Sequence, residues 1–179
     1  MFEHILAWHG LGWLVWAIWW IFFAGGIKQG QTPQHAWAWL VQVLLIFGGF
    51  VLLNQYDPSN STLEQVLSLL LLVVGLAGMY RARRMLGAAW TAPAGLPDPQ
   101  PLITCGLYRR IRHPFYSFFV VAFAGTALAH GWQALWIVVL VLVAFMWKAR
   151  HEDAALRQIF GSTWSDYSNH TARMLPGIW

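Results

Sequence analysis

The stretch FYSFFVVAFAGTALAHGWQALWIVVLVLVAFMW, residues 115–147, contains no Asp, Glu, Lys or Arg. A membrane-spanning helix needs about 20 mainly apolar residues, so this stretch is too long for one ordinary span. His130-Gly131 lies near its middle, and glycine tolerates the backbone conformations that a turn requires. We therefore predict a helical hairpin. At 1.5 Å per residue its arms are each about 23 Å long, which is short for a full crossing.

Three more apolar runs are long enough to span a membrane: residues 5–26, 35–53 and 63–80. Together with the hairpin they predict an all-α integral membrane protein with about five transmembrane helices. The composition agrees, because 58% of the 179 residues are apolar and 10% are charged, whereas roughly a quarter of the residues are charged in soluble domains. The first run lacks a basic n-region and follows Glu3, so we interpret it as a retained helix rather than a cleaved signal peptide.

Lysine and arginine favour the cytoplasmic side of short connections between membrane helices. With five helices and the N-terminus outside, all eleven Lys and Arg residues fall on the cytoplasmic side. The sequence therefore predicts an N-out, C-in multi-pass protein, which we place in a bacterial inner membrane with its functional site facing the cytoplasm. This topology, together with attraction to anionic lipid, explains the net charge of +4, so we do not expect nucleic-acid binding.

The chain divides into two parts of different character. Residues 1–80 consist of apolar helices with short loops, and we interpret them as a transmembrane scaffold. Residues 81–179 begin with a loop, 81–112, that holds four of the eight prolines and is too long for a simple connection. We predict that this second part carries the functional site. Cys105, the single cysteine, can form no internal disulfide, and we interpret it as a small buried residue rather than a reactive thiol.

The chain after the hairpin has the pattern of two further helical pieces. Residues 148–158 continue the second arm out of the membrane, with apolar residues set among charges. Gly161 is expected to end this helix, as glycine often does at a helix C-terminus. Residues 163–170 then predict one more short helix.

Some isolated residues could suggest a cofactor. Trp13, Trp16 and Trp20 share one face of the first helix, but interfacial belts and packing between helices explain tryptophans in a membrane protein. His9 and His35 could be considered as haem ligands. The first two helices run antiparallel, which places these two histidines at different depths, so we do not favour haem.

Polar residues that could take part in binding or catalysis flank the hairpin. Residues 112–116, RHPFY, stand at its start, where proline suits the first helical turn because its missing N–H would be unpaired there. The amide groups at that helix start attract an anionic group, and His113 and Tyr116 share a helix face. Beyond the second arm lie Glu152 and Asp153, whose carboxylates can accept hydrogen bonds from hydroxyl or amino groups. The predicted topology brings these segments to the same face of the membrane.

The order of the motifs is more specific than any one of them. Thr-x-Gly-x-Tyr at 104–108 precedes Arg-His-Pro-x-Tyr at 112–116, then the hairpin, an acidic pair at 152–153, and Leu-x-x-x-Phe-Gly at 156–161 with a tail that ends in Leu-Pro. This order resembles the isoprenylcysteine carboxyl methyltransferase family and its phospholipid methyltransferase relatives, over about residues 80–176. The resemblance implies a membrane-embedded methyltransferase that uses S-adenosylmethionine, with a lipophilic or small-molecule acceptor and the cofactor held in the region 81–179.

Carried over position by position, the resemblance implies two kinds of site residue. The cofactor-binding residues are Leu102, Ile103, Gly106, Tyr108, His113, Tyr116, Glu152 and Asp153. The catalytic or substrate-positioning residues are Arg112 and Arg173. The chain departs from the family pattern at two places, because Asp153 stands where a second glutamate is usual and Asn169-His170 stands where a basic pair is usual. A second substrate arginine is therefore missing unless Arg173 substitutes for it, and no metal site is predicted.

The chemistry leaves the acceptor open. Methyl transfer from a sulfonium chiefly needs alignment and exclusion of water. A carboxylate acceptor needs no base and could be held by Arg112, whereas an amine or thiol would need a proton acceptor, for which His113 is nearest. Two other functions are retained: an NADPH-dependent enzyme of the sterol-reductase type, indicated by the tail, and a non-enzymatic membrane accessory protein with a decayed site. In a purely structural alternative, Arg112 anchors its helix to phosphates and Glu152 pairs with Arg112 or Arg150.

Overall fold

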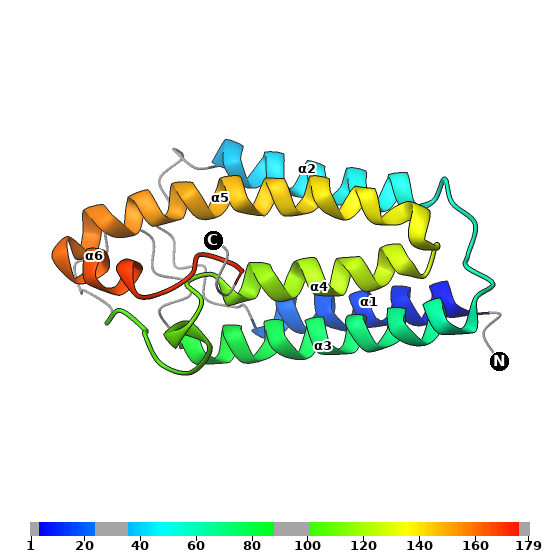
Figure 1. Ribbon diagram of the computed structural model, residues 1–179, viewed down its shortest axis with the longest axis horizontal. Helices are drawn as coiled ribbons and strands as arrows, with labels where there is room; N and C mark the ends of the chain where they lie inside the picture. Colours follow the sequence, from blue (N-terminus) through cyan, green and yellow to red (C-terminus); the bar gives the residue numbers. More distant parts are fainter. Residues whose placement is uncertain (1–3, 24–35, 88–100, 176–179) are drawn as a thin grey trace.

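The computed structural model describes residues 4–23, 36–87 and 101–175. Within these ranges the α-helices are α1 (Ile5–Phe23), α2 (Ala36–Leu53), α3 (Thr62–Leu86), α4 (Pro114–Leu128), α5 (Trp136–Phe160) and α6 (Ser162–Asn169). Two short 3-10 helices are η3 (Gly106–Arg109) and η4 (Trp132–Leu135). Helices α1 to α5 run along the long axis, and α6 lies at one end of the bundle (Figure 1). The predicted all-α class is confirmed for the described residues, which contain no strand beyond one bridge between Ile111 and Ala172.

The predicted hairpin is present. α4 ends at Leu128, and the chain turns through His130-Gly131, where Gly131 has φ 94°. Glycine adopts such a positive φ with little strain. α5 then continues unbroken past the apolar run, as the sequence indicates, and ends at Gly161 with φ 53°. α6 confirms the short helix that was expected after this glycine.

α3 is longer than predicted. The apolar pattern ends at Tyr80, but the helix continues through six more residues, 81–86, and ends at Gly87. The arginines of residues 81–84 therefore lie on the last turns of α3 and not in a loop. Arg83 Nη1 donates to the carbonyl of Gly87 at 2.9 Å, which satisfies an acceptor at the helix end. The hydropathy pattern marks the end of the apolar stretch and not the end of the helix. The prolines of residues 88–100 lie outside the described residues.

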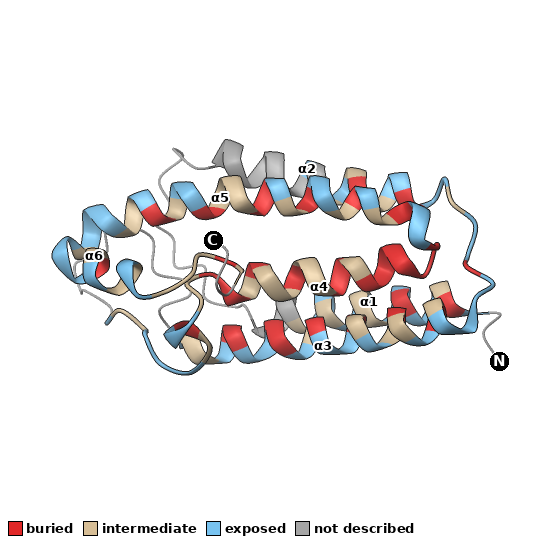
Figure 2. Cartoon of the chain, in the orientation of Figure 1, coloured by how far each residue is buried: buried red, intermediate tan, exposed pale blue. Residues whose placement is uncertain are grey.

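Two helical stretches among the described residues are long and apolar enough to cross a membrane, Thr62–Leu86 and Trp132–Phe160. Ile5–Trp19 and Pro114–Leu128 are shorter apolar helices. Many large apolar side chains of these helices are exposed, whereas the buried positions face neighbouring helices (Figure 2). An apolar outer surface suits contact with lipid. The number of spans and the N-out orientation stay predictions.

α3 and α4 approach each other so closely that side chains are excluded at their contact. A Cβ on Gly75 would collide with the backbone of Ala122, and a Cβ on Gly125 would collide with the backbone around Ser68. Small residues at a crossing allow helices to pack this tightly in membrane proteins. The contact places the beginning of α4 at the same end of the bundle as the end of α3 (Figure 1).

Tryptophans of α1 pack between helices, as predicted. The Trp13 ring lies 5.5 Å from that of Phe50 in α2 and 5.2 Å from that of Phe119 in α4, measured between centroids. The Trp16 ring lies 6.1 Å from that of Phe115. Such aromatic contacts add to the stability gained from burying apolar area. The side chain of Trp20 lies outside the described residues.

A buried polar group joins α1 to α3 and α4. His9 is 1% exposed, and its Nδ1 and Nε2 lie 3.2 Å from the hydroxyls of Thr126 and Ser68, respectively. Trp13 Nε1 donates to the same Thr126 hydroxyl at 2.9 Å. We call these four residues the His9 cluster. Since both ring nitrogens of His9 have hydroxyl partners, the contacts argue against haem ligation; His35 lies outside the described residues.

Candidate functional site

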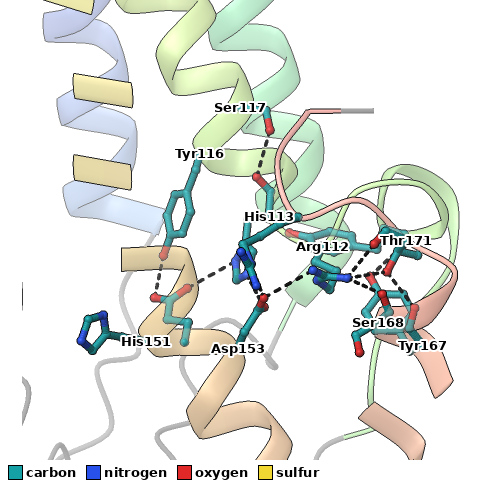
Figure 3. A network of polar contacts seen from close by, with 12 residues as sticks. Arg112, His113, Tyr116, Ser117, His151, Asp153, Tyr167, Ser168 and Thr171 are labelled. Carbon is teal, nitrogen blue, oxygen red and sulfur yellow. Dashed lines mark hydrogen bonds and ion pairs between the residues drawn. The ribbon is translucent and has the colours of Figure 1, made fainter. Parts of the chain in front are cut away.

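The RHPFY segment and the acidic pair meet at one end of the bundle. There α4 begins, α5 runs past it, and the chain after α6 returns (Figure 3). Two extended pieces of chain pair side by side: Arg112 N–H donates to Ala172 at 2.8 Å, His113 N–H to Arg173 at 2.9 Å, and Ala172 N–H to Arg110 at 3.0 Å. This pairing holds the returning tail beside the start of α4.

The start of α4 directs His113 toward α5. Pro114 occupies the first turn, and His113 is the N-cap with φ −121° and ψ 58°, but its side chain makes no capping hydrogen bond. The His113 carbonyl accepts from the N–H groups of Tyr116 and Ser117, at 3.1 Å and 3.3 Å, so these amides do not need the imidazole. It stacks instead on the Tyr116 ring, with centroids 5.4 Å apart and planes 5° from parallel. The predicted shared face of His113 and Tyr116 is therefore present.

The Asp153 carboxylate is the centre of the site. Its Oδ1 lies 2.8 Å from His113 Nε2, and its Oδ2 lies 2.6 Å from Arg173 Nε and 3.5 Å from Arg112 Nη2. The side chain is 12% exposed. A carboxylate this buried is stable only when its charge is paired, and here three basic side chains surround it. The aspartate side chain is thus long enough to contact all three basic groups.

Glu152 forms the more open half of the acidic pair. Its Oε1 accepts a hydrogen bond from the Tyr116 hydroxyl at 2.6 Å, and its Oε2 lies 3.5 Å from His113 Nδ1. Lys148, one helical turn earlier, lies 3.7 Å from Oε1. The Glu152 side chain is 40% exposed, so this carboxylate is accessible to a ligand.

His113 lies between the two carboxylates and is 7% exposed. Burial alone would lower the pKa of this imidazole, but the hydrogen bonds and negative charges of Asp153 and Glu152 outweigh burial and raise the pKa of His113 above its ordinary value. The imidazolium can donate from both nitrogens, one toward each carboxylate. The network therefore favours the charged histidine.

Arg112 extends from Asp153 to the tail (Figure 3). Its Nη1 donates to the carbonyls of Ser168 and Thr171, both at 2.6 Å. The side chain is 9% exposed. Burial lowers the pKa of Arg112, and the Asp153 charge opposes that shift. A guanidinium stays charged over the ordinary pH range, so Arg112 brings a permanent positive charge to the interior of the site.

The segment before α4 lies at the same end but outside the charged network. Leu102 and Ile103 are half-buried, and Gly106 (φ 57°) lies against Met85 of α3, where a Cβ would clash with the methionine side chain. Tyr108 is buried, and its hydroxyl donates to the carbonyl of Ala82 at 3.3 Å. Burial raises the pKa of Tyr108, so the phenol stays protonated.

The prediction that Cys105 is buried is wrong. The thiol is exposed. Cys105 directly precedes η3, where the buried position belongs to Tyr108 three residues later. The preference of cysteine for the protein interior did not decide its position here, because the larger aromatic ring fills the contact with α3.

Several residues of the site were missed from the sequence. Lys148 contacts Glu152 and lies 5.0 Å from the centroid of the Tyr116 ring; its spacing of four residues from Glu152 on one helix was a usable signal. Tyr167 and Ser117 donate to backbone carbonyls of Tyr108 and Met174, at 2.7 Å and 2.6 Å. Backbone acceptors so distant in sequence leave no pattern from which to predict these two contacts.

The sequence profile of the phospholipid methyltransferase family matches residues 63–163. The chain belongs to this family. The phospholipid methyltransferase region runs from the beginning of α3 through α5 to the beginning of α6. It therefore contains the RHPFY segment and the acidic pair, while Arg173 lies beyond it. The family resemblance inferred from the order of the motifs is confirmed.

Two similar proteins are named "Probable protein-S-isoprenylcysteine O-methyltransferase", one from Oryza sativa subsp. indica and one from Oryza sativa subsp. japonica. Each is 32% identical to the chain over 83 residues, which is 45% of this chain and 44% of the relative. The similarity thus spans less than half the length of either rice protein. It agrees with membership in a methyltransferase family.

Proposed function

We propose that the chain is an S-adenosylmethionine-dependent methyltransferase that acts on a small or lipophilic acceptor at the cytoplasmic face of the membrane. The observation that carries the proposal is one hydrogen-bonded network in which His113 and Tyr116 of the RHPFY segment meet Glu152 and Asp153. These residues come from α4 and α5 and converge in a chain of the phospholipid methyltransferase family. The proposal rests on this geometry and family together.

The polar and aromatic groups of the network suit S-adenosylmethionine as a ligand. S-adenosylmethionine carries a sulfonium, an ammonium, ribose hydroxyls and a carboxylate. Glu152, 40% exposed, can accept hydrogen bonds from a hydroxyl or an amino group. A cation already lies beside the Tyr116 ring, because the Lys148 ammonium is 5.0 Å from its centroid, so the surroundings of this ring suit positive charge. Arg173, 23% exposed, offers a guanidinium for a carboxylate. When bound, the cofactor would supply an electrophilic methyl group.

We propose that the segment before α4 forms a second wall of the cofactor site. Leu102 and Ile103 are half-buried there and would supply apolar contacts. Gly106 brings the backbone close to α3, and Tyr108 fixes the segment through its bond to the carbonyl of Ala82. In this arrangement Gly106 and Tyr108 support the wall, while Leu102 and Ile103 line it.

The protein's own contribution to methyl transfer is alignment, charge and exclusion of water, since the reaction is an in-line displacement at a cationic centre. Each nitrogen of His113 lies within 3.5 Å of a carboxylate oxygen. An amine or thiol acceptor would require His113 to lose one of these contacts to act as a base. A carboxylate acceptor arrives without a proton to remove and could be held by an arginine, so we favour it. The exposed apolar helix faces support entry of a lipophilic acceptor from the bilayer.

The first test is binding of S-adenosylhomocysteine to the full chain in detergent, measured by isothermal calorimetry and by thermal shift. We expect binding to the wild type and its loss in Glu152→Ala and in His113→Ala. Asp166→Ala and His170→Ala are matched controls, because both side chains are exposed, lie on or next to α6, and carry the same chemical groups. Absence of any response in the folded wild type would refute the proposed function. Retained affinity in both site variants would refute the residue assignments.

The second test identifies the acceptor. The protein is incubated with a methyl-labelled donor and a membrane lipid extract, and labelled products are identified by mass spectrometry. Base-labile label indicates a methyl ester, and base-stable label indicates an amine or thioether product. Thermal stabilisation by NADPH but not by the methyl donor would instead favour the reductase alternative. Binding of neither, with recovery of a stable protein partner, would favour the accessory role.

A further inference from the structure

The C-terminal segment, residues 167–174, is attached to the start of α4 by more than the backbone pairing. The Tyr167 hydroxyl donates to the carbonyl of Tyr108 at 2.7 Å, and the Ser117 hydroxyl donates to the carbonyl of Met174 at 2.6 Å. These bonds lie at opposite ends of the C-terminal segment. Arg112 lies between them, and it is the single charged side chain among the described contacts from residues 108–117 to this segment.

The Arg112 guanidinium is directed at the C-terminal segment. Nη1 contacts the carbonyls of Ser168 and Thr171 at 2.6 Å each and lies 3.4 Å from the Thr171 hydroxyl. Nη2 is 3.5 Å from Asp153. A carbonyl at the end of α6 would otherwise lack a partner, and a cationic donor there also interacts favourably with the helix dipole. With its side chain 9% exposed, Arg112 presents little of the guanidinium to a ligand.

The two arginines of the site are linked through one carboxylate oxygen. Arg173 Nε and Arg112 Nη2 both approach Asp153 Oδ2, at 2.6 Å and 3.5 Å. Arg173 follows Thr171 by two residues, so a shift of the carbonyl that Arg112 holds would also shift Arg173. Arg112 is thus placed to determine where Arg173 stands.

We infer that Arg112 is a positioning residue: it fixes the C-terminal segment over the site and so sets Arg173 beside Asp153, without itself contacting the acceptor. The kinetic consequence of this inference rests on the proposed function, but its structural part does not. Lysine cannot replace Arg112, because its single ammonium has no planar fork to reach two carbonyls and a carboxylate at once.

Hydrogen–deuterium exchange of the full chain in detergent tests the structural part. The amide of Ala172 donates to Arg110 and that of His113 donates to Arg173, so both report directly on the pairing. In Arg112→Gln and Arg112→Lys we expect peptides covering 168–174 and 110–113 to exchange at least about tenfold faster, the factor for losing one hydrogen bond to a charged group. Arg110→Gln, which removes the same charge from an exposed neighbour, should leave exchange unchanged. Unchanged exchange in both Arg112 variants would overturn the inference.

Steady-state kinetics test the functional part. Because Arg112 acts through Arg173, Arg112→Lys and Arg173→Gln should change kcat, the KM for the acceptor and S-adenosylhomocysteine binding in the same direction, with the smaller changes in Arg112→Lys. A large rise in acceptor KM in Arg112→Lys, with exchange of 168–174 as in the wild type, would show that Arg112 contacts the acceptor and would overturn the inference.

A second variant covers the case in which Arg112 variants fail to fold. Tyr167→Phe removes a different attachment of the same segment and should also speed exchange of 168–174 and lower kcat. If it speeds exchange but leaves kcat unchanged, the position of the segment does not matter for turnover, and the inference is wrong. Failure of the wild type to bind S-adenosylhomocysteine would refute the proposed function, whereas the exchange experiment would still decide the structural role of Arg112.

Discussion

His9 and His113 are both almost fully buried histidines with both ring nitrogens engaged, yet their neighbours differ. His9 is 1% exposed and has two uncharged hydroxyl partners, contributed by α3 and α4. His113 is 7% exposed and lies between two carboxylates, one of which is accessible. The hydroxyl partners of His9 link three helices in the protein interior. The partners of His113 are charged, and one of them, Glu152, is 40% exposed. The two histidines therefore differ in their partner groups, uncharged for His9 and charged for His113, and not in how deeply they are buried.

The largest expected effect comes from removing the carboxylate that compensates the buried cations. Asp153→Ala would leave Arg112, His113 and Arg173 facing one another without their shared anion. Breaking a buried ion pair from one side typically costs about 3–5 kcal/mol, so we expect a loss of this order in the free energy of unfolding. Chemical unfolding in detergent, followed by tryptophan fluorescence, measures it.

Two variants control this experiment. Asp153→Glu restores the carboxylate and should recover most of the stability, because the three basic side chains again have an anion to pair with. Asp166→Asn removes an exposed charge from α6 and should change stability by less than about 0.5 kcal/mol. If Asp153→Ala were as stable as Asp166→Asn, the charged network would contribute nothing to holding the two helices and the tail together.

Removing the Tyr116 hydroxyl tests a single hydrogen bond of the same network. Tyr116→Phe keeps the ring that stacks on His113 but removes the hydrogen bond to Glu152. Without this bond the Glu152 carboxylate loses one of the contacts that orient it. Since a hydrogen bond to a charged group contributes about 1.5 kcal/mol at the lower end, we expect S-adenosylhomocysteine to bind up to roughly tenfold more weakly. Calorimetry checks this value, and Tyr56→Phe, at the other end of the bundle, is the matched control. Equal affinities of both variants for S-adenosylhomocysteine would show that the Tyr116 hydroxyl does not contribute to binding.

These two regions also differ in how far the sequence could predict them. The charged site carries local signals: a proline after His113 marks a helix start, and two adjacent acidic residues follow the apolar run that begins there. The order of these motifs therefore predicts that their polar side chains lie close together. The His9 cluster carries no such signal, because Ser68 and Thr126 are ordinary residues in apolar runs and meet His9 only through the packing of three helices. The role of Arg112 was hidden for the same reason, since its partners are backbone carbonyls of the distant tail.

The pH dependence of stability tests the charge of His113. The pKa of His113 is raised in the folded state by Asp153 and Glu152, so its contribution to stability is fully present below the unfolded-state pKa of about 6.5. It is lost as the pH rises through the folded-state pKa. We expect the difference in unfolding free energy between wild type and His113→Gln to be constant at low pH and to shrink as the pH is raised. A difference that grew with pH would mean that His113 is neutral in the folded protein.

The smallest expected effect concerns the uncharged cluster. Thr126→Val keeps the volume of the side chain but removes the hydroxyl that contacts His9 and accepts from Trp13. Hydrogen bonds between helices within a membrane contribute about 0.6 kcal/mol on average and up to about 1.7, so the loss in unfolding free energy should fall in this range. Binding of S-adenosylhomocysteine should stay as in the wild type, and Thr163→Val, at an exposed position of α6, should change neither quantity. A loss of ligand affinity in Thr126→Val would mean that the packing of α1 against α3 and α4 is transmitted along α4 to His113. The closed cluster and the open site would then act as one unit, and the contrast between the two histidines would hold for their charge but not for their function.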